Sequence, residues 1–179
     1  MTFYHCSPVA GLKILQPQKP QHFEKAAAVY LTTLRPMALM YGIRNYEYTY
    51  GYTKAGVLYF DEYFRNALEI LYRGKRASLY LCAPEQTVPT QIPNEAVSEK
   101  PVPITEEILI ADVCQALLDE EKRGTLRIHR YEEQSPESLD SIFRSEVDTI
   151  RCLLQTTGPQ ADYYRTYYPK CWAFAQQEV

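Results

Sequence analysis

The chain has 179 residues, of which 46% are hydrophobic and 23% charged, a composition typical of a soluble globular protein with one well-packed domain. Its 19 basic and 22 acidic residues give a formal net charge of -3, which argues against a protein built mainly to neutralise nucleic-acid phosphates. No apolar run is long enough to cross a bilayer, and the N-terminus lacks the pattern of a secretory signal. We therefore expect a cytoplasmic protein without a membrane partner.

Cysteine and histidine are spaced in a way that disfavours a metal site. The five cysteines include no pair two or three residues apart, and the three histidines are scattered along the chain. Zinc sites usually draw ligands from such close pairs, so we expect no metal. An odd number of separated cysteines is typical of reduced thiols in the cytoplasm.

Short strands and loops are predicted for the first part of the chain. The aromatic segment 3–6 predicts a strand that ends at Ser7-Pro8, and residues 9–15 predict a short helix closed by Pro17. A second strand is expected over 28–32, followed by a helix that begins near Pro36. Residues 45–56, in which tyrosines alternate at 46, 48, 50 and 52, read as irregular or hairpin-like.

The middle of the chain alternates between strands and helices. Strands are expected at 57–60 and 78–82, with a helix from Tyr63 to Tyr72 between them. Three prolines predict a surface loop over 83–94, and residues 95–98 and 102–104 look extended.

Helices dominate the last third. The apolar spacing predicts helices over 108–122 and from Ser135-Pro136 to 154, with Ser135 as N-cap, and a strand over 126–129. A tyrosine-rich helical stretch, interrupted by Pro159 and Pro169, completes the chain. Strands in front of helices indicate the α+β class rather than a doubly wound sheet.

The usual nucleotide and hydrolase motifs are missing from the sequence. It contains no P-loop, no dinucleotide-binding GxGxxG, no HExxH and no GxSxG. His5 and Cys6 are adjacent, so on a strand their side chains point to opposite faces and do not form a catalytic pair.

Two short segments carry a more specific pattern. Tyr4-His5-Cys6-Ser7 ends the first predicted strand, and Val29-Tyr30-Leu31-Thr32 forms the second. This arrangement resembles the ADP-ribosyltransferase fold, in the His-Tyr-Glu branch that includes diphtheria-like toxins, poly(ADP-ribose) polymerases and uncharacterised bacterial members. The resemblance covers about the first 45 residues. It implies a split β-sheet core over 1–131 and C-terminal helices over 132–179, packed on the same domain.

The resemblance assigns roles to the residues of the first motif. His5 matches the histidine that hydrogen-bonds the 2'-hydroxyl of the nicotinamide ribose, and an imidazole can do so while its other nitrogen is held by the backbone. Cys6 stands where the family often has glycine, which implies a narrower pocket. Ser7 matches the neighbouring polar residue. The alternative for His5 is a structural histidine with its hydrogen bonds satisfied within the fold.

The second motif supplies the rings. The resemblance implies that Tyr30 stacks on the nicotinamide, with Tyr41 as the opposite wall, because the face of a tyrosine attracts a cationic ring. Thr32 lies two residues on, on the same side of the strand. Without the resemblance, Tyr30 would be read as a core residue.

A glutamate completes the family's site by stabilising the positive charge that develops as nicotinamide departs. Glu95 is the first choice because it opens the extended segment after the proline-rich loop, and Glu107 and Glu106 are the alternatives. The implied activity is cleavage of the nicotinamide–ribose bond of NAD, used as a substrate, and transfer of ADP-ribose to a protein or nucleic-acid acceptor that the sequence does not identify.

Two other functions remain open. The first is an inactive relative that serves as a protein-binding module, which Cys6 and the uncertain third motif would favour. The second is an enzyme like the RNA 2'-phosphotransferases, which share the fold. Those enzymes surround a phosphate with basic groups, and the acidic balance of this chain disfavours that function.

Overall fold

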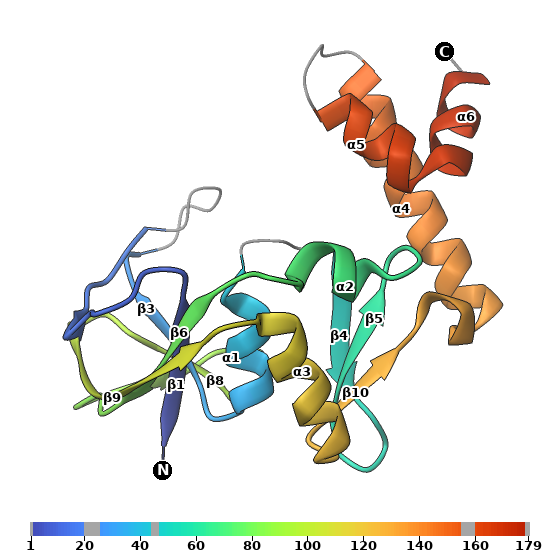
Figure 1. Ribbon diagram of the computed structural model, residues 1–179. Helices are drawn as coiled ribbons and strands as arrows, with labels where there is room; N and C mark the ends of the chain where they lie inside the picture. Colours follow the sequence, from blue (N-terminus) through green and yellow to red (C-terminus); the bar gives the residue numbers. More distant parts are fainter. Residues whose placement is uncertain (1, 20–25, 44–46, 155–159, 178–179) are drawn as a thin grey trace. The chain divides into compact units, whose positions relative to one another are not determined.

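The computed structural model describes residues 2–19, 26–43, 47–154 and 160–177. It is a mixed α+β structure with an antiparallel sheet and helices (Figure 1). The chain divides into two compact units. The first comprises Met1–Tyr46, Gly51–Tyr59 and Leu68–Arg127, and the second comprises Glu47–Tyr50, Phe60–Ala67 and Ile128–Val179. The expectation that both parts form a single domain stays a prediction.

The larger sheet has seven strands in the order β2-β9-β6-β1-β3-β8-β7, and all neighbours are antiparallel. Its strands are β1 (Phe3–Ser7), β2 (Ile14–Leu15), β3 (Val29–Thr32), β6 (Ala77–Cys82), β7 (Val88–Pro89), β8 (Glu95–Ser98) and β9 (Val102–Ile110). The register joins β1 to β6 at five positions but joins β1 to β3 only at Tyr4↔Thr32. The sheet is therefore weakly connected between β1 and β3.

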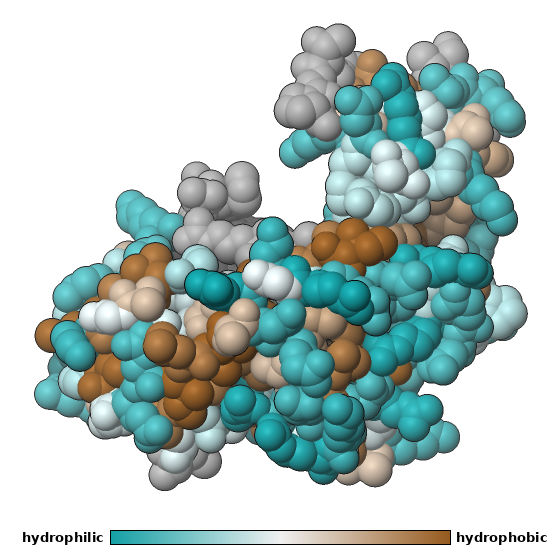
Figure 2. Space-filling model, viewed as in Figure 1, coloured by the Kyte–Doolittle hydropathy of each residue, from teal (hydrophilic) through white to brown (hydrophobic). Residues whose placement is uncertain are grey.

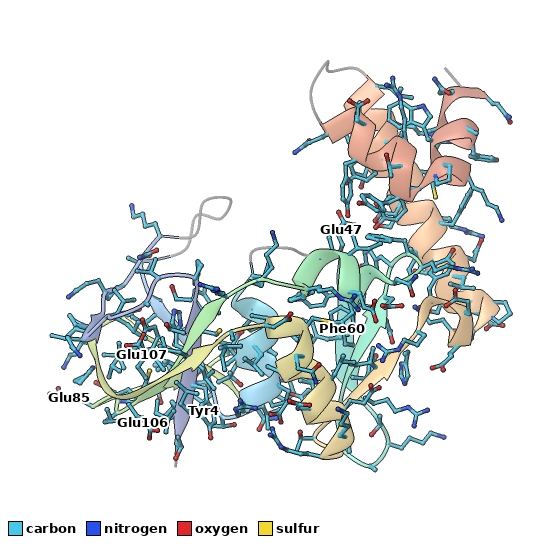
Figure 3. The ribbon with its side chains drawn as sticks, viewed as in Figure 1. Tyr4, Glu47, Phe60, Glu85, Glu106 and Glu107 are labelled. Carbon is cyan, nitrogen blue, oxygen red and sulfur yellow. The ribbon has the colours of Figure 1, made fainter. Side chains whose placement is uncertain are left out.

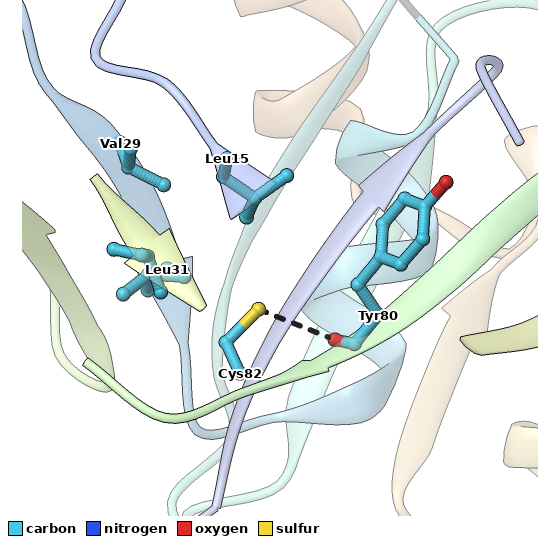
Figure 4. Packing of buried hydrophobic residues seen from close by; sticks show 6 residues of the cluster. Leu15, Val29, Leu31, Tyr80 and Cys82 are labelled. Carbon is cyan, nitrogen blue, oxygen red and sulfur yellow. Dashed lines mark hydrogen bonds between the residues drawn. The ribbon is translucent and has the colours of Figure 1, made fainter. Parts of the chain in front are cut away.

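Apolar side chains pack on one face of this sheet. The cluster comes from β2, β3, β6 and β9, and Figure 4 shows five of its members labelled: Leu15, Val29, Leu31, Tyr80 and Cys82. Along a strand the side chains alternate between faces, so Val29 and Leu31 project together. Figure 2 shows apolar surface over the part of the molecule that holds β6 and β9, where Leu109 is 73% exposed.

Helix α1 (Arg35–Tyr41) packs against β1 and β3, and α3 (Val113–Lys122) packs against α1. Pro36 lies in the first turn of α1, where its missing N–H is tolerated, as the sequence predicts. The side chains from Pro36 to Met40 are all buried. Glu120 of α3 is also buried and pairs with Arg35, while Arg123 lies 2.6 Å from the same carboxylate.

Two helix predictions are wrong because tertiary partners satisfy the backbone instead. Residues 9–15 form no helix: Tyr80 bonds the carbonyl of Val9 at 2.6 Å and the N–H of Leu12 at 3.3 Å, and β2 pairs with β9. The segment 108–110 belongs to β9, where it pairs with β6, and α3 begins only after Asp112, whose side chain caps it.

A third helix is shorter than expected. Helix α2 spans Ala67–Tyr72 and not 63–72, because Asn66 has a left-handed backbone with φ of 59° and a helix cannot continue through it. The loop predicted over 83–94 contains the two-residue strand β7. The strands expected at 3–6, 28–32, 78–82, 95–98 and 126–129 are confirmed within one or two residues at each end.

The second sheet has the strand order β10-β5-β4, with β4 at Tyr48–Tyr52, β5 at Leu58–Glu62 and β10 at Leu126–His129. The short helix η1 spans Tyr131–Glu133. The helices that follow are α4 (Pro136–Leu154), α5 (Gln160–Tyr167) and α6 (Pro169–Gln177), and α5 and α6 both pack on α4. The Oγ of Ser135 accepts from the N–H of Ser138 at 3.2 Å, which confirms the predicted N-cap.

Candidate functional site

The residues of the predicted motifs lie on three neighbouring strands of the larger sheet. Strand β3 pairs with β1 on one side and with β8 on the other, so segments far apart in the sequence become neighbours. The strand residues in question are His5, Cys6 and Ser7 on β1, Tyr30 and Thr32 on β3, and Glu95 at the start of β8.

The imidazole of His5 is held by the backbone of the second motif. Its Nδ1 lies 3.0 Å from the carbonyl oxygen of Tyr30. Because a carbonyl only accepts, Nδ1 carries the proton, and Nε2 of the neutral ring is an acceptor. Burial lowers the pKa of His5 below its ordinary value of 6.5, and the bond to Tyr30 offsets this only in part. His5 is therefore neutral near pH 7 and would accept a hydrogen bond from a ligand hydroxyl.

The register places His5 and Glu95 on different faces of the sheet. Tyr4 is opposite Thr32, and Thr32 is opposite Glu95, so these three side chains share one face. His5 follows Tyr4 directly and therefore projects from the other face, opposite Tyr80 of β6. The fold brings His5 to the backbone of Tyr30, and it brings Thr32 to Glu95, but it does not join the two pairs through a side-chain contact among the described residues.

Thr32 has a structural role. It is buried, its hydroxyl donates to the Sδ of Met37 at 3.2 Å, and the same oxygen accepts from the N–H of Leu34 at 3.1 Å. These contacts fix the entry of the chain into α1. Tyr30 is half-buried, so its ring is the only part of the second motif with surface left for a ligand.

Glu95 is a buried carboxylate beside a strained loop. It is 8% exposed, and its Oε1 accepts from the hydroxyl of Thr90 at 2.9 Å. The preceding residue, Asn94, has φ of 65°, which asparagine tolerates better than most residues. The backbone N–H of Thr33 donates a hydrogen bond to the carbonyl oxygen of Asn94 at 3.0 Å. Glu95 is therefore held at the start of β8 by a fixed turn, beside the end of β3.

Tyr52 was not singled out by sequence reasoning, yet it contacts the same turn. Its hydroxyl donates to the carbonyl of Pro93 at 2.7 Å and accepts from the side-chain amide of Asn94 at 3.1 Å. The strict alternation of tyrosines marked it only as one ring of a hairpin wall. Tyr46, another member of that series, lies outside the described residues.

One carboxylate oxygen of Glu107 belongs to a structural network. Its Oε1 accepts from the N–H of Gly11 at 2.9 Å and from the Ser78 hydroxyl at 2.7 Å, with the Tyr80 hydroxyl at 3.3 Å. These hydrogen bonds, led by that of Gly11, hold the pKa of Glu107 below its ordinary value. The carboxylate anchors the loop after β1 and has no contact with His5, because Tyr80 lies between them in the register.

Glu106, the other alternative, alternates with Glu107 along β9 and therefore projects from the opposite face, as Figure 3 shows. Neither glutamate of β9 reaches the strands β3 and β8, because β6 and β1 separate them. Of the three candidates, Glu95 alone lies next to the second motif.

Cys6 projects toward α1 and not toward the imidazole. A Cβ at Gly42 would lie 2.3 Å from the Sγ of Cys6, so the thiol fills the space left by the glycine at the end of α1. Burial raises the pKa of Cys6 to about 12, so the thiol stays protonated. The expected narrowing of a pocket by Cys6 is therefore replaced by a packing contact with the helix.

Ser7 holds a turn, whereas Tyr41 lies half-buried at the end of a helix. The Oγ of Ser7 accepts from the N–H of Val9 at 3.1 Å, which fixes the turn after β1. Tyr41 is the last residue of α1 and is half-buried. It adjoins Gly42, the position that meets Cys6.

Comparisons of the chain with family models, with curated proteins and with solved structures give no match. Within the described ranges, no group of three or more His, Cys, Asp or Glu side chains is arranged to hold a metal ion. Among the helices that the structure describes, none has the length and apolarity required to cross a membrane.

Proposed function

We propose that the first unit binds NAD at strands β1, β3 and β8, cleaves its nicotinamide–ribose bond and transfers ADP-ribose to an acceptor. The observation that carries the proposal is the hydrogen bond of 3.0 Å between Nδ1 of His5 and the carbonyl of Tyr30, with Glu95 on the adjoining strand. The three residue types of the motif, taken from distant parts of the sequence, thus lie on neighbouring strands, with His5 projecting from the face opposite Glu95. The weak β1–β3 pairing also supports a split sheet.

In this proposal the neutral imidazole positions the ribose. With Nδ1 committed to Tyr30, Nε2 of His5 accepts the hydrogen of a ribose hydroxyl. The half-buried ring of Tyr30 stacks on the nicotinamide, whose positive charge the ring face attracts. Tyr30 shares its face of β3 with Thr32, so its ring projects from the face of Glu95 and not from that of His5. The proposal therefore requires the nucleoside to extend past the weakly paired junction of β1 and β3 to meet both residues.

Glu95 supplies the negative charge that the reaction needs. As the bond between C1' of the ribose and the pyridine nitrogen breaks, both electrons leave with nicotinamide, and positive charge develops on the sugar. A carboxylate near that sugar lowers the barrier. The proposal requires the Glu95 side chain to exchange its bond to Thr90 for one to the ribose, since the present geometry points it away from His5.

Two observations favour a second candidate function, a non-catalytic relative that binds a nucleotide or a protein. Glu95 is buried against Thr90, and the register separates it from His5. A protein that binds NAD without releasing nicotinamide would show this second function. An RNA 2'-phosphotransferase-like activity has less support, because the chain carries a net charge of -3.

The test measures NAD binding by calorimetry and nicotinamide release by chromatography, both on the full chain. We expect the wild type to bind, His5→Ala and Tyr30→Ala to bind more weakly, and Glu95→Gln to bind while its release falls on the order of 100-fold or more. Glu85→Gln is the matched control, because Glu85 is an exposed glutamate in the same unit. Absence of NAD binding by the wild type refutes the proposal, and binding without release selects the second candidate.

A further inference from the structure

The second unit holds two buried polar atoms without a hydrogen-bond partner among the described residues. They are Oε2 of Glu146, on α4, and the hydroxyl of Tyr163, on α5. Glu146 as a whole is only 5% exposed. A buried carboxylate is normally paired with a cation or saturated with donors, because its charged form is costly to remove from water. This feature belongs to neither the predicted motifs nor the proposed NAD site.

The surroundings of Glu146 are aromatic. Phe64 stacks on Tyr167 with ring centroids 4.7 Å apart and meets Tyr168 edge-on at 5.4 Å. Tyr163 packs against Tyr164 at 5.4 Å and against Tyr167 at 4.8 Å. Rings of this kind exclude water but supply few donors, so they stabilise a neutral group better than a charged one.

A second carboxylate lies in the same cluster. Glu47 accepts a hydrogen bond from the Tyr168 hydroxyl, and burial raises its pKa. Burial and then the charge of Glu47 raise the pKa of Glu146 to about 7. The charge of Glu146 raises the pKa values of several other groups in part, and these groups show which elements face it. They are Tyr63, which follows β5, Tyr163 and Tyr164 on α5, Tyr168, which follows α5, and Cys171 on α6.

The neighbouring cations pair with other carboxylates. On α4, Arg144 lies 2.8 Å from Asp140 and Arg151 lies 3.1 Å from Asp148. These pairs are formed within the exposed part of the helix. The residues one turn from Glu146 on its own face, Ile142 and Ile150, are apolar and buried.

Two further basic residues belong to the helices that pack on α4. Arg165 of α5 pairs with Asp162 at 3.1 Å and lies over the ring of Trp172. Lys170 of α6 is exposed. Within the described ranges, the structure therefore shows no basic side chain paired with Glu146.

We propose that Glu146 is a pH-sensitive switch in the second unit: it is protonated when α5 and α6 are packed on α4, and its ionisation loosens that packing. When the proton leaves to solvent, the carboxylate becomes an unpaired buried charge beside Glu47, which is a strongly unfavourable arrangement. The charge is relieved when water reaches Oε2, and this requires the rings of α5 to move away from α4. This inference is independent of the proposed NAD chemistry.

The direction of the pH dependence follows from linkage. An ordinary glutamate, as in the unpacked state, ionises near 4.5, whereas the packed state holds the proton to about 7. The packed state binds more protons between these values, so its stability is full below the lower value and falls as pH rises through the upper one. The packing equilibrium constant should fall on the order of 100-fold between pH 5 and pH 8.

A single tryptophan provides an intrinsic fluorescence probe for this transition. This residue, Trp172, lies on α6 and is 8% exposed. Urea unfolding of the full chain, followed by Trp172 fluorescence at pH 5 and at pH 8, measures the stability of the packing. We expect the packing equilibrium constant of the wild type to fall on the order of 100-fold from pH 5 to pH 8. Glu146→Gln keeps the shape of the side chain but cannot ionise, so its packing equilibrium constant should not show this fall.

Two further variants complete the test. Asp148→Asn removes an exposed carboxylate of the same helix and should behave as the wild type does. Glu47→Gln removes the neighbouring charge and should reduce the loss at pH 8. Every variant retains His129, which is bonded to Asp61 in this unit. Equal pH dependence in the wild type and Glu146→Gln overturns the proposal. If Glu146→Gln does not fold at pH 5, the Glu47→Gln variant decides. A loss of stability at pH 8 equal to that of the wild type then overturns the proposal.

Discussion

Replacing Gly42 with alanine should reverse the usual effect of such a substitution. Gly42 has φ of -64° and ψ of -21°, a helical backbone that alanine adopts without strain. At such a position alanine normally stabilises a protein by about 0.5–1 kcal/mol, because it restricts the unfolded chain. An alanine Cβ at Gly42, however, would lie 2.3 Å from the Sγ and 3.0 Å from the Cβ of Cys6.

The size of the effect follows from this overlap. Nonbonded heavy atoms sit at about 3.5–4 Å, so the sulfur or the helix must move by more than about 1 Å. Cys6 has little freedom, because β1 is paired with β6 over its whole length and the residue is 7% exposed. Overpacking of this kind costs about 1–3 kcal/mol, which outweighs the gain in chain entropy. We expect Gly42→Ala to lower the free energy of unfolding by about 1–2 kcal/mol.

A double-mutant cycle isolates the contact. Cys6→Gly removes both the sulfur and the Cβ, and in that background Gly42→Ala should become neutral or stabilising. Urea unfolding followed by far-UV circular dichroism gives the four free energies. If Gly42→Ala fails to destabilise the wild type, or costs the same in both backgrounds, then Cys6 does not lie against the end of α1 as described.

Two further predictions concern the same unit. Glu120→Gln should destabilise the chain by about 3 kcal/mol, because it leaves the guanidinium of Arg35 without its buried partner; thermal unfolding measures this, and a loss below 1 kcal/mol would contradict it. The lowered pKa of His5 means that the unfolded chain binds more protons, so stability is full above pH 6.5 and falls on acidification below it. His5→Gln, compared with the wild type in melts between pH 5 and 7, should remove part of this acid sensitivity, and equal acid sensitivity in both proteins would contradict the reasoning.

Local patterns were sufficient for several elements. The alternating and β-branched content of 28–32 and 126–129 predicted strands that the structure contains, and Pro36 and Ser135 marked the starts of α1 and α4. These features depend on neighbours within a turn or two of the chain. Their stabilising contacts are local, so a reading of the sequence finds them.

Patterns failed where distant residues supplied the hydrogen bonds. Residues 9–15 have helical spacing, but the Tyr80 hydroxyl and strand β9 bond their backbone instead. The apolar run at 108–110 fits a helix and a strand equally well, and only its pairing with β6 decides between them. Glu107 is a candidate carboxylate by sequence for the same reason, since nothing local reveals that Gly11 and Ser78 both donate to its Oε1.

By itself, the sequence determined the composition class, the α+β order of the elements and the two segments around His5 and Tyr30. These depend on residue type and short-range periodicity. Only the tertiary structure decided that Nδ1 of His5 is bound to the Tyr30 carbonyl and that Glu95 projects from the other face. Such facts depend on strand register, since a shift of one residue moves every side chain of a strand to the opposite face. Register is set by all the neighbouring strands together, and no single segment encodes it.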